Sequence, residues 1–165
     1  MNKNQSIFYV YVYLNPLKPG NYNYEDLHFE YEPFYIGKGK GERINHHLND
    51  NYNEKSTEKN KLKGNILKNI LKYYSKEQYK EYYIIKIQEN IIDFCACELE
   101  KYLINLIGRK DLRLGPLTNL TIGGESLAGK NNPRYIKISK KNIKYIIFLY
   151  LNKRKGLHAI SKLVN

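Results

Sequence analysis

The sequence predicts an α+β domain in which strands alternate with helices. Three segments are rich in aromatic and β-branched residues and favour strands: residues 6–14, 28–37 and 81–91. Two segments carry apolar residues at helical spacing, residues 57–75 and 93–108. Because 42% of the 165 residues are hydrophobic, the chain can bury a core of its own, which argues against wholesale disorder.

The first predicted strand, "SIFYVYVYL", has two apolar faces. Alternate side chains of a strand point to opposite sides, so its tyrosines share one face and Phe8, Val10, Val12 and Leu14 share the other. Neither face is charged, and we therefore expect a central strand covered on both sides. The segment that follows contains Asn-Pro and Pro-Gly turn signals and is long for a hairpin loop, so we expect an irregular hairpin insertion at 17–32.

Each predicted helix has one apolar side. For residues 57–75 the expected core-facing residues are Leu62, Ile66, Ile70 and Tyr73, with Leu67 and Leu71 beside them. For residues 93–108 they are Leu99, Leu103 and Leu106, between an N-cap candidate, Asp93, and a C-cap candidate, Gly108. A short helix is expected earlier, from residue 42 to about residue 48.

The chain carries a formal net charge of +12 and has a pI of about 9.5. Such a field favours polyanions, meaning nucleic acid or an anionic membrane surface. Lys, Asn, Ile and Tyr are abundant together, so codon bias in an AT-rich genome is an alternative source of part of this charge. Cys95 and Cys97 lie two apart on a predicted helix, a spacing that suits neither a disulfide nor a zinc pair, and we expect both to be buried and reduced.

No apolar run approaches membrane-spanning length, and the N-terminus has no long apolar core after its basic start. We therefore expect no membrane partner and an intracellular location. That location is the cytoplasm or, if a virus or phage encodes the protein, its host cell.

The density of Gly, Pro, Asn and Ser predicts three parts. These are a domain at residues 1–124, a Gly/Asn-rich linker at 125–138 and a helical tail at 139–165. The tail resembles the opening two helices of a helix-turn-helix. Two interpretations stay open: a longer protein has been cut here, or the tail packs on the domain.

The segment "PFYIGKGKGERINHHL", residues 33–48, gathers glycines and basic residues in one turn. Glycines let the backbone approach an anion closely, and Lys38, Lys40 and Arg43 supply positive charge. Arg43 and His47 are four residues apart and would project from one face of a helix. The segment suits a phosphodiester, but a lone Gly-Lys-Gly turn is common, and by itself a basic turn on a solvated surface is the better explanation.

This segment belongs to a series that resembles the GIY-YIG nuclease family and covers residues 7 to about 124. The elements, in chain order, are "YVY" at 9–11, "YIG" at 35–37, Arg43, His47, Glu100 and Asn119. The family's glutamate lies on a helix, and Glu100 is its counterpart here, with Glu98 as the competing candidate. The family's asparagine comes late in the domain, and Asn119 is its counterpart. Each residue alone has a simpler explanation as a strand aromatic, an exposed helix carboxylate or a turn residue. The ordered series favours the nuclease.

The sequence departs from the family pattern in two ways. Tyr9 stands where the first motif has glycine, so the tyrosine carried over is Tyr11, with Tyr9 and Tyr13 partly interchangeable with it. Tyr11 is favoured because Asn15 and Pro16 then lie where the family's turn begins. The segment between the two motifs is also longer than the short hairpin usual in the family.

The resemblance implies roles for the residues. Glu100 would hold one divalent metal, Mg²⁺ or Mn²⁺, through oxygen. Tyr11 would orient or deprotonate the attacking water, and Arg43 would clamp the scissile phosphate. Tyr35 and His47 would position water and phosphate, and His47 could relay a proton.

Three more residues are expected to bind or support the substrate: Lys38, Lys40 and Asn119. The implied fold is a small, mainly antiparallel three-stranded sheet flanked by helices, with a helical C-terminal tail. The implied activity is that of a metal-dependent, homing-endonuclease-like enzyme on double-stranded DNA, with a transient dimer left open. The alternative is a catalytically inactive, basic nucleic-acid-binding module on the same scaffold. A nucleotide-binding regulator is weaker, since the chain has neither a Walker loop nor a Rossmann fingerprint.

Overall fold

A computed structural model describes residues 7–49 and 60–123 of the chain. In this part a three-stranded antiparallel sheet has the order β2-β1-β3. Its strands are β1 (Phe8–Tyr24), β2 (Leu27–Gly39) and β3 (Ile84–Ile91). The α+β class and the three strands flanked by helices are thus confirmed, and β1 is central as its two apolar faces predict. The predicted linker at 125–138 and tail at 139–165 lie outside the described residues.

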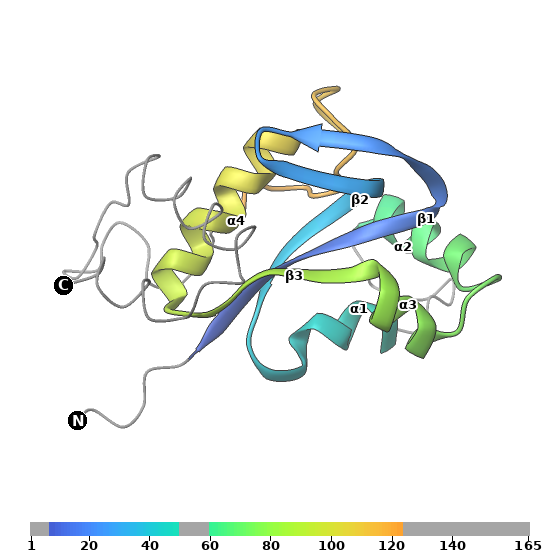
Figure 1. Ribbon diagram of the computed structural model, residues 1–165, viewed down its shortest axis with the longest axis horizontal. Coiled ribbons are helices and arrows are strands. Elements are labelled where there is room, and N and C mark those ends of the chain that lie inside the picture. The colour runs from blue at the N-terminus through green and yellow to red at the C-terminus, as the bar shows by residue number, and fades with distance from the viewer. Residues whose placement is uncertain (1–6, 50–59, 124–165) are drawn as a thin grey trace.

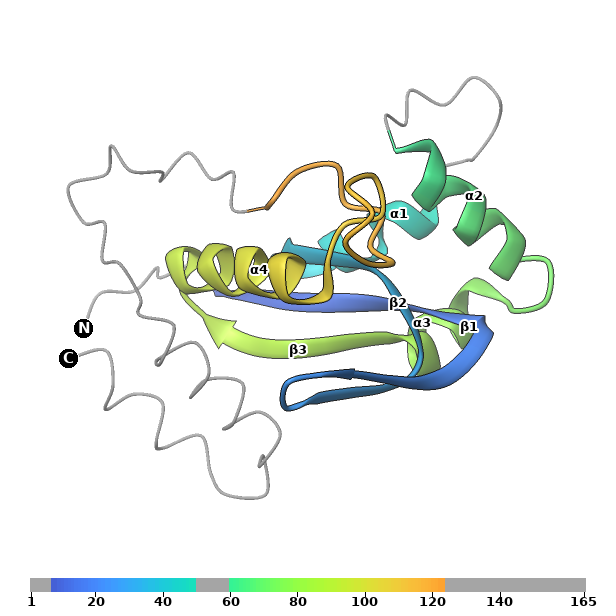
Figure 2. The same cartoon turned by 90° about the horizontal axis from the view of Figure 1, so that it is seen from above.

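Helices cover both faces of the sheet. They are the 3₁₀ helix η1 (Gly41–Asn45) and the α-helices α1 (His46–Asn49), α2 (Lys61–Ile70), α3 (Lys76–Tyr83) and α4 (Asp93–Ile107). Figure 1 shows α4 on one side of the strands and α1 and α3 on the other. Figure 2 shows α2 at the end of the sheet far from the start of α4. None of the helices described is long and apolar enough to cross a membrane.

The two faces of β1 lie in two separate cores. Val10, Val12 and Leu14 pack with α4, while Tyr9, Tyr11 and Tyr13 pack with residues of α1, α2 and α3. The side chains of Tyr11 and Tyr13 are almost completely buried. Both faces are therefore covered, as the absence of charge on either face predicts. Cys95 and Cys97 are buried and free, also as predicted.

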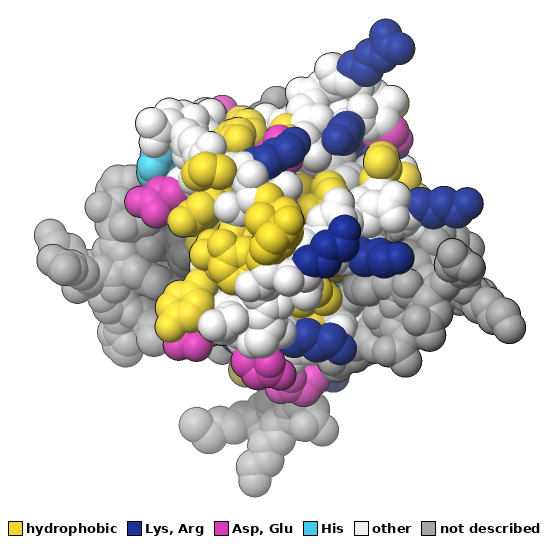
Figure 3. Space-filling model, turned by 90° about the vertical axis from the view of Figure 1, so that its right-hand side faces the viewer, with side chains coloured by type: hydrophobic (Ala, Val, Ile, Leu, Met, Phe, Trp, Pro, Cys, Tyr) yellow, Lys and Arg dark blue, Asp and Glu magenta, His cyan; other side chains and the backbone are white. Residues whose placement is uncertain are grey.

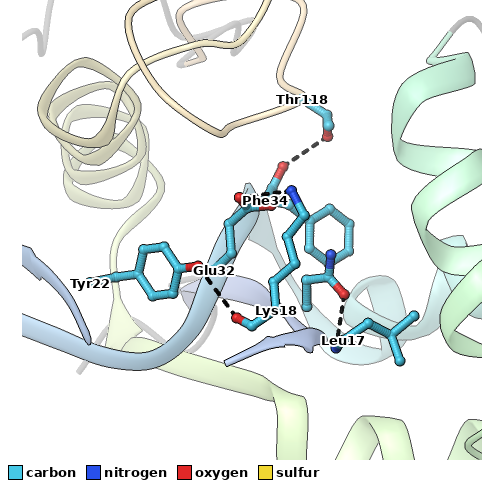
Figure 4. Close-up of polar contacts among 7 residues, drawn as sticks. Leu17, Lys18, Tyr22, Glu32, Phe34 and Thr118 are labelled. Atoms are coloured by element: carbon cyan, nitrogen blue, oxygen red, sulfur yellow. Dashed lines mark hydrogen bonds and ion pairs between the residues drawn. The ribbon is translucent and has the colours of Figure 1, made fainter. Parts of the chain in front are cut away.

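The predicted irregular insertion is a continuation of the β1–β2 hairpin. The two strands stay paired to Tyr24 and Leu27, with register shifts between Asn15 and Tyr22. Across them the ammonium of Lys18 lies 3.0 Å from both carboxylate oxygens of Glu32 (Figure 4). These register shifts bend the hairpin insertion, and its Pro and Gly residues account for such irregularities.

The far end of this hairpin lies beside α4 (Figure 1). The hydroxyl of Tyr102 on α4 donates to Glu25 at 2.6 Å, and Leu27 and Phe29 are buried in the same core as α4. The insertion therefore extends the core over α4.

The structure corrects the predicted helix boundaries. Strand 81–91 begins only at Ile84, because residues 76–83 form α3. A capping box starts this helix: Gln78 donates its backbone N–H to the Ser75 hydroxyl, and the Gln78 side chain accepts from the Ser75 backbone. The sequence carries this start signal as the S-x-x-Q pattern of Ser75 and Gln78. At α4 the N-cap is Ile92, and Asp93 is the first helical residue.

The predicted core-facing side of residues 57–75 is correct for Leu67 and Ile70, which are buried, and wrong for two other residues. Leu62 and Tyr73 are 43% and 73% exposed, whereas α2 buries Lys63, Leu67 and Ile70. The error arose because the pattern counted apolar residues alone, and a lysine occupies one position on the buried side.

Tyrosines join α3 to the hairpin. Tyr79 is fully buried and donates its hydroxyl to the Leu14 carbonyl at 2.9 Å, and the ring of Tyr83 contacts Tyr31 and Tyr74. Hydrophobic side chains also reach the surface on the face shown in Figure 3, where Lys and Arg side chains lie beside them.

The loop after α4 returns to β2. Gly108 ends the helix with φ of 92°, and an added Cβ there would lie 2.2 Å from the Leu114 carbonyl oxygen, so the turn requires glycine. The backbone N–H and the hydroxyl of Thr118 both donate to the Phe34 carbonyl, at 2.7 and 2.8 Å (Figure 4). The loop thereby covers an edge of the sheet and carries residues 119–123 toward the end of β2.

Candidate active site

An open pocket of about 500 Å³ lies where β2 ends. Its lining residues are Phe8, Lys38, Gly39, Lys40, Arg43, Glu100, Thr121 and Gly123. Four residues predicted from the sequence therefore share one cavity, although α4 supplies one and the strand and turn supply the others. The pocket has one carboxylate, from Glu100, and three basic side chains.

Glu100 is held in place by backbone on two sides. Its Oε1 accepts from the backbone N–H of Lys38 at 3.1 Å. On the other side, Gly123 has φ of 75°, and an added Cβ there would lie 3.0 Å from the Glu100 Cγ. A glycine is needed for this close approach. Glu98, the competitor for this position, instead pairs with Lys101 at 3.0 Å, so Glu100 is the better candidate.

Lys38 faces the pocket but is already paired within the protein. Its ammonium lies 2.7 Å from Asp93 Oδ1 and 3.0 Å from Cys97 Sγ. Although burial lowers the pKa of Lys38, the hydrogen bonds to Asp93 and Cys97 outweigh it and raise the pKa above its usual value. Lys38 thus ties β2 to the first turn of α4, and its charge is fixed at the pocket wall.

Lys40 and Arg43 are exposed at the start of η1. Gly41, with φ of 54°, makes the turn between them. Both side chains are exposed and line the pocket, and their binding to a polyanion stays a prediction.

The three tyrosines of β1 are not equivalent. Tyr9 donates its hydroxyl to the Gly41 carbonyl at 2.6 Å and accepts from the Ile44 N–H at 3.0 Å. Tyr13 donates to the Ile44 carbonyl at 2.5 Å. Both hydroxyls are engaged in holding η1, so Tyr11 is the candidate for chemistry among the three.

Tyr11 lies between these two anchors, with its ring against Gly37. An added Cβ at Gly37 would be 2.5 Å from the Tyr11 ring, which explains the glycine of the "YIG" motif. Within residues 7–49 and 60–123, no hydrogen bond engages the Tyr11 hydroxyl. Burial, and then neighbouring tyrosines, raise its pKa well above 10, while Arg43 acts in the opposite direction. The Tyr11 hydroxyl therefore stays protonated at neutral pH, and it can act as a base only if additional positive charge lowers its pKa.

Tyr35 and His47 meet on the same face of the sheet as Tyr11. The rings of Tyr35 and His47 are 5.2 Å apart, edge to face, and those of Tyr11 and Tyr35 are 6.3 Å apart. Burial, then the charges of Lys63, Arg43 and His46, lower the pKa of His47 to about 3. His47 is thus neutral at physiological pH, which suits positioning by hydrogen bonds better than a proton relay.

Asn119 is buried and supports the site from behind. Its amide accepts from the Ile36 N–H at 3.0 Å and donates to the Ile36 carbonyl at 2.8 Å. Since both ends of the amide engage this backbone, Asn119 holds β2 in place beside the pocket and does not line it.

We expect Asn119→Ala to lower the free energy of unfolding by about 2 to 4 kcal/mol, because it leaves two buried backbone groups of Ile36 without partners. Urea unfolding measures the change. Asn69→Ala, at an exposed position of α2, is the control and should have little effect. Equal stability of the two variants would contradict this role of Asn119.

The comparison with protein families decides what kind of domain carries this pocket. Residues 8–130, well over half of the chain, match the model of the LEM-3-like GIY-YIG domain. The chain belongs to the GIY-YIG nuclease family. No curated protein and no solved structure matches the sequence.

Membership of the GIY-YIG family implies a nuclease acting on nucleic acid, and such nucleases generally use divalent metal ions. In the described parts of this domain no group of three or more His, Cys, Asp or Glu side chains could hold a metal. The donor set at Glu100 nevertheless fits Mg²⁺, because this ion keeps several waters and is often held by one or two carboxylates together with substrate phosphates.

Two residues that contact the candidate site were missed from the sequence. Asp93, taken for a helix cap, pairs with Lys38. Lys63 contacts His47, and a signal for it existed: Lys63, Leu67 and Ile70 have the spacing of one helix face, so this lysine had to point inward.

Proposed function

We propose that this GIY-YIG domain is a metal-dependent endonuclease that hydrolyses phosphodiester bonds in double-stranded DNA. The observation that carries the proposal is the pocket, in which a backbone-held carboxylate faces exposed basic side chains. A phosphodiester needs both, since its charge must be neutralised while the leaving oxygen departs.

Arg43 and Lys40 would bind the phosphate. Both are exposed at the pocket rim, and the guanidinium of Arg43 can give two parallel hydrogen bonds to phosphate oxygens. Lys38 adds charge at the wall, while its pairing with Asp93 keeps it from moving onto the substrate.

Glu100 would hold the metal, which when bound stabilises charge on the phosphoryl oxygens as a Lewis acid. Tyr11 would orient the attacking water through its unengaged hydroxyl. Because its pKa is raised, the hydroxyl is protonated at neutral pH and can donate or accept a hydrogen bond. Additional positive charge nearby would lower that pKa and allow the hydroxyl to act as a base. Tyr35 and neutral His47 would fix the water and phosphate by hydrogen bonds.

The biological role is proposed only in general terms. The matching model describes a LEM-3-like domain, and this does not single out a homing role, so we propose an endonuclease without assigning homing, repair or restriction. The nuclease domain at 1–124, the linker at 125–138, the helical tail at 139–165, a transient dimer on DNA and an intracellular location remain parts of the proposal.

A supercoiled-plasmid assay tests the proposal. With Mg²⁺ or Mn²⁺ we expect nicking or linearisation, and with EDTA we expect none, because the metal supplies much of the charge stabilisation. Cleavage that persists in EDTA would contradict metal dependence. Salt-sensitive DNA binding without cleavage under any of these conditions would favour the inactive binding module.

A further inference from the structure

Lys63 is a lysine with a buried side chain. It is 4% exposed and lies on the inner side of α2 with Leu67 and Ile70. Lysines are almost never fully buried unless they are paired, because removing an ammonium from water is costly. The contacts of its ammonium therefore indicate the role of Lys63.

The ammonium of Lys63 lies against two residues of the candidate site. It is 3.0 Å from Nδ1 and 3.2 Å from Nε2 of His47, and 4.4 Å from the centre of the Tyr35 ring. The second contact is a cation–π interaction. Three separate elements, β2, α1 and α2, thus meet at one buried charge.

The backbone of Lys63 is fixed relative to β2. Asn60 caps α2 by accepting from the Lys63 N–H at 3.0 Å, and its amide donates to the Thr118 carbonyl at 2.6 Å. Thr118 in turn donates to the Phe34 carbonyl, next to Tyr35. This chain of hydrogen bonds sets where the lysine enters the site.

We propose that Lys63 is a positioning residue of the nuclease site, which holds the His47 imidazole in one orientation and in its neutral form and seats the Tyr35 ring. Its effect on cleavage rests on the proposed function, whereas its effect on His47 does not.

The chemistry of the contact favours the neutral ring. An ammonium has three donors and no acceptor, so a His47 nitrogen that accepts from Lys63 must be unprotonated. Because the ammonium lies near both nitrogens, either neutral tautomer can accept from it, whereas the doubly protonated ring cannot. Among the described residues, Lys63, Arg43, His46 and the rings of Tyr13 and Tyr35 lie near His47. Burial and then the electrostatic effects of Lys63, Arg43 and His46 oppose the protonation of His47.

An NMR titration of His47 in the full chain tests this without requiring any activity. Lys63→Met removes the charge and keeps the side-chain length, and Lys68→Met, on the exposed side of α2, is the matched control. The signal is assigned with His47→Gln. Between pH 8 and pH 4 we expect His47 to stay neutral in the wild type and in Lys68→Met.

In Lys63→Met we expect the His47 pKa to rise from about 3, because one of the opposing cations is gone. It should remain below 6.5, since burial, Arg43 and His46 still act. Lys63→Arg keeps a charge and should keep His47 neutral. An unchanged titration in Lys63→Met would overturn the proposal. If Lys63→Met does not fold by circular dichroism, Lys63→Gln is titrated in its place with the same two outcomes.

Plasmid cleavage supplies the second readout. We expect Lys63→Met to lower kcat by about tenfold to a hundredfold with little change in KM, since a misplaced group costs rate more than binding. The loss should deepen as pH falls through the raised His47 pKa, and Lys63→Arg should recover part of it. A pH-independent loss would overturn the positioning role. If the wild type does not cleave at all, the proposed function fails, and the titration still decides the role of Lys63.

Discussion

Glu100→Gln is expected to abolish metal-dependent DNA cleavage while the protein stays folded. The amide has the same shape as the carboxylate, and its oxygen can still accept from the Lys38 N–H that holds Glu100 in place. The negative charge that would hold the metal is lost. Because the metal contributes several kcal/mol to transition-state stabilisation, we expect a loss of about a thousandfold or more in cleavage rate.

Glu98→Gln is the matched control for this prediction. It makes the same chemical change on the same helix, and its partner is Lys101. It should cleave within a few-fold of the wild type, and circular dichroism and urea unfolding of both variants check that the fold is kept. Wild-type rates in Glu100→Gln, or a loss confined to Glu98→Gln, would contradict the assignment of the carboxylate.

The sequence allowed the central strand and the candidate pocket to be predicted for different reasons. Alternation along "SIFYVYVYL" is a local pattern, so two buried faces could be inferred without knowing the partners. The pocket residues were found because the ordered motif series has a known arrangement. Neither Lys38 nor Glu100 alone indicates a contact across 62 positions of the chain.

What could not be predicted depends on contacts distant in sequence. Asn119 looked like a turn residue, and only the paired hydrogen bonds to Ile36 show that it supports β2. Which β1 tyrosine is available was also undetermined, because all three share one face. Their difference arises from the path of η1, whose backbone engages Tyr9 and Tyr13. Lys63 was missed because the core-facing side of α2 had been assigned from apolar residues alone.

Tyr11→Phe is expected to lower activity and Tyr9→Phe to lower stability, although each removes one hydroxyl from the same face of β1. Tyr11→Phe removes a hydroxyl that holds no described backbone group. Its stability should stay close to that of the wild type, and its cleavage rate should fall by about a hundredfold or more, as expected for loss of a group that assists proton transfer. Plasmid cleavage under single-turnover conditions measures that rate.

Tyr9→Phe leaves the Gly41 carbonyl and the Ile44 N–H without their partner. We expect it to lower the free energy of unfolding, measured in urea, by about 1 to 3 kcal/mol. Its activity should fall only if the altered turn displaces Arg43, which the same turn carries. The comparison separates two uses of tyrosine that the sequence could not distinguish. A stable Tyr9→Phe protein that has lost cleavage would transfer the catalytic role to Tyr9. Loss of stability in Tyr11→Phe would show that its hydroxyl serves the core, because a buried phenol that is not used in chemistry must contribute to packing or hydrogen bonding.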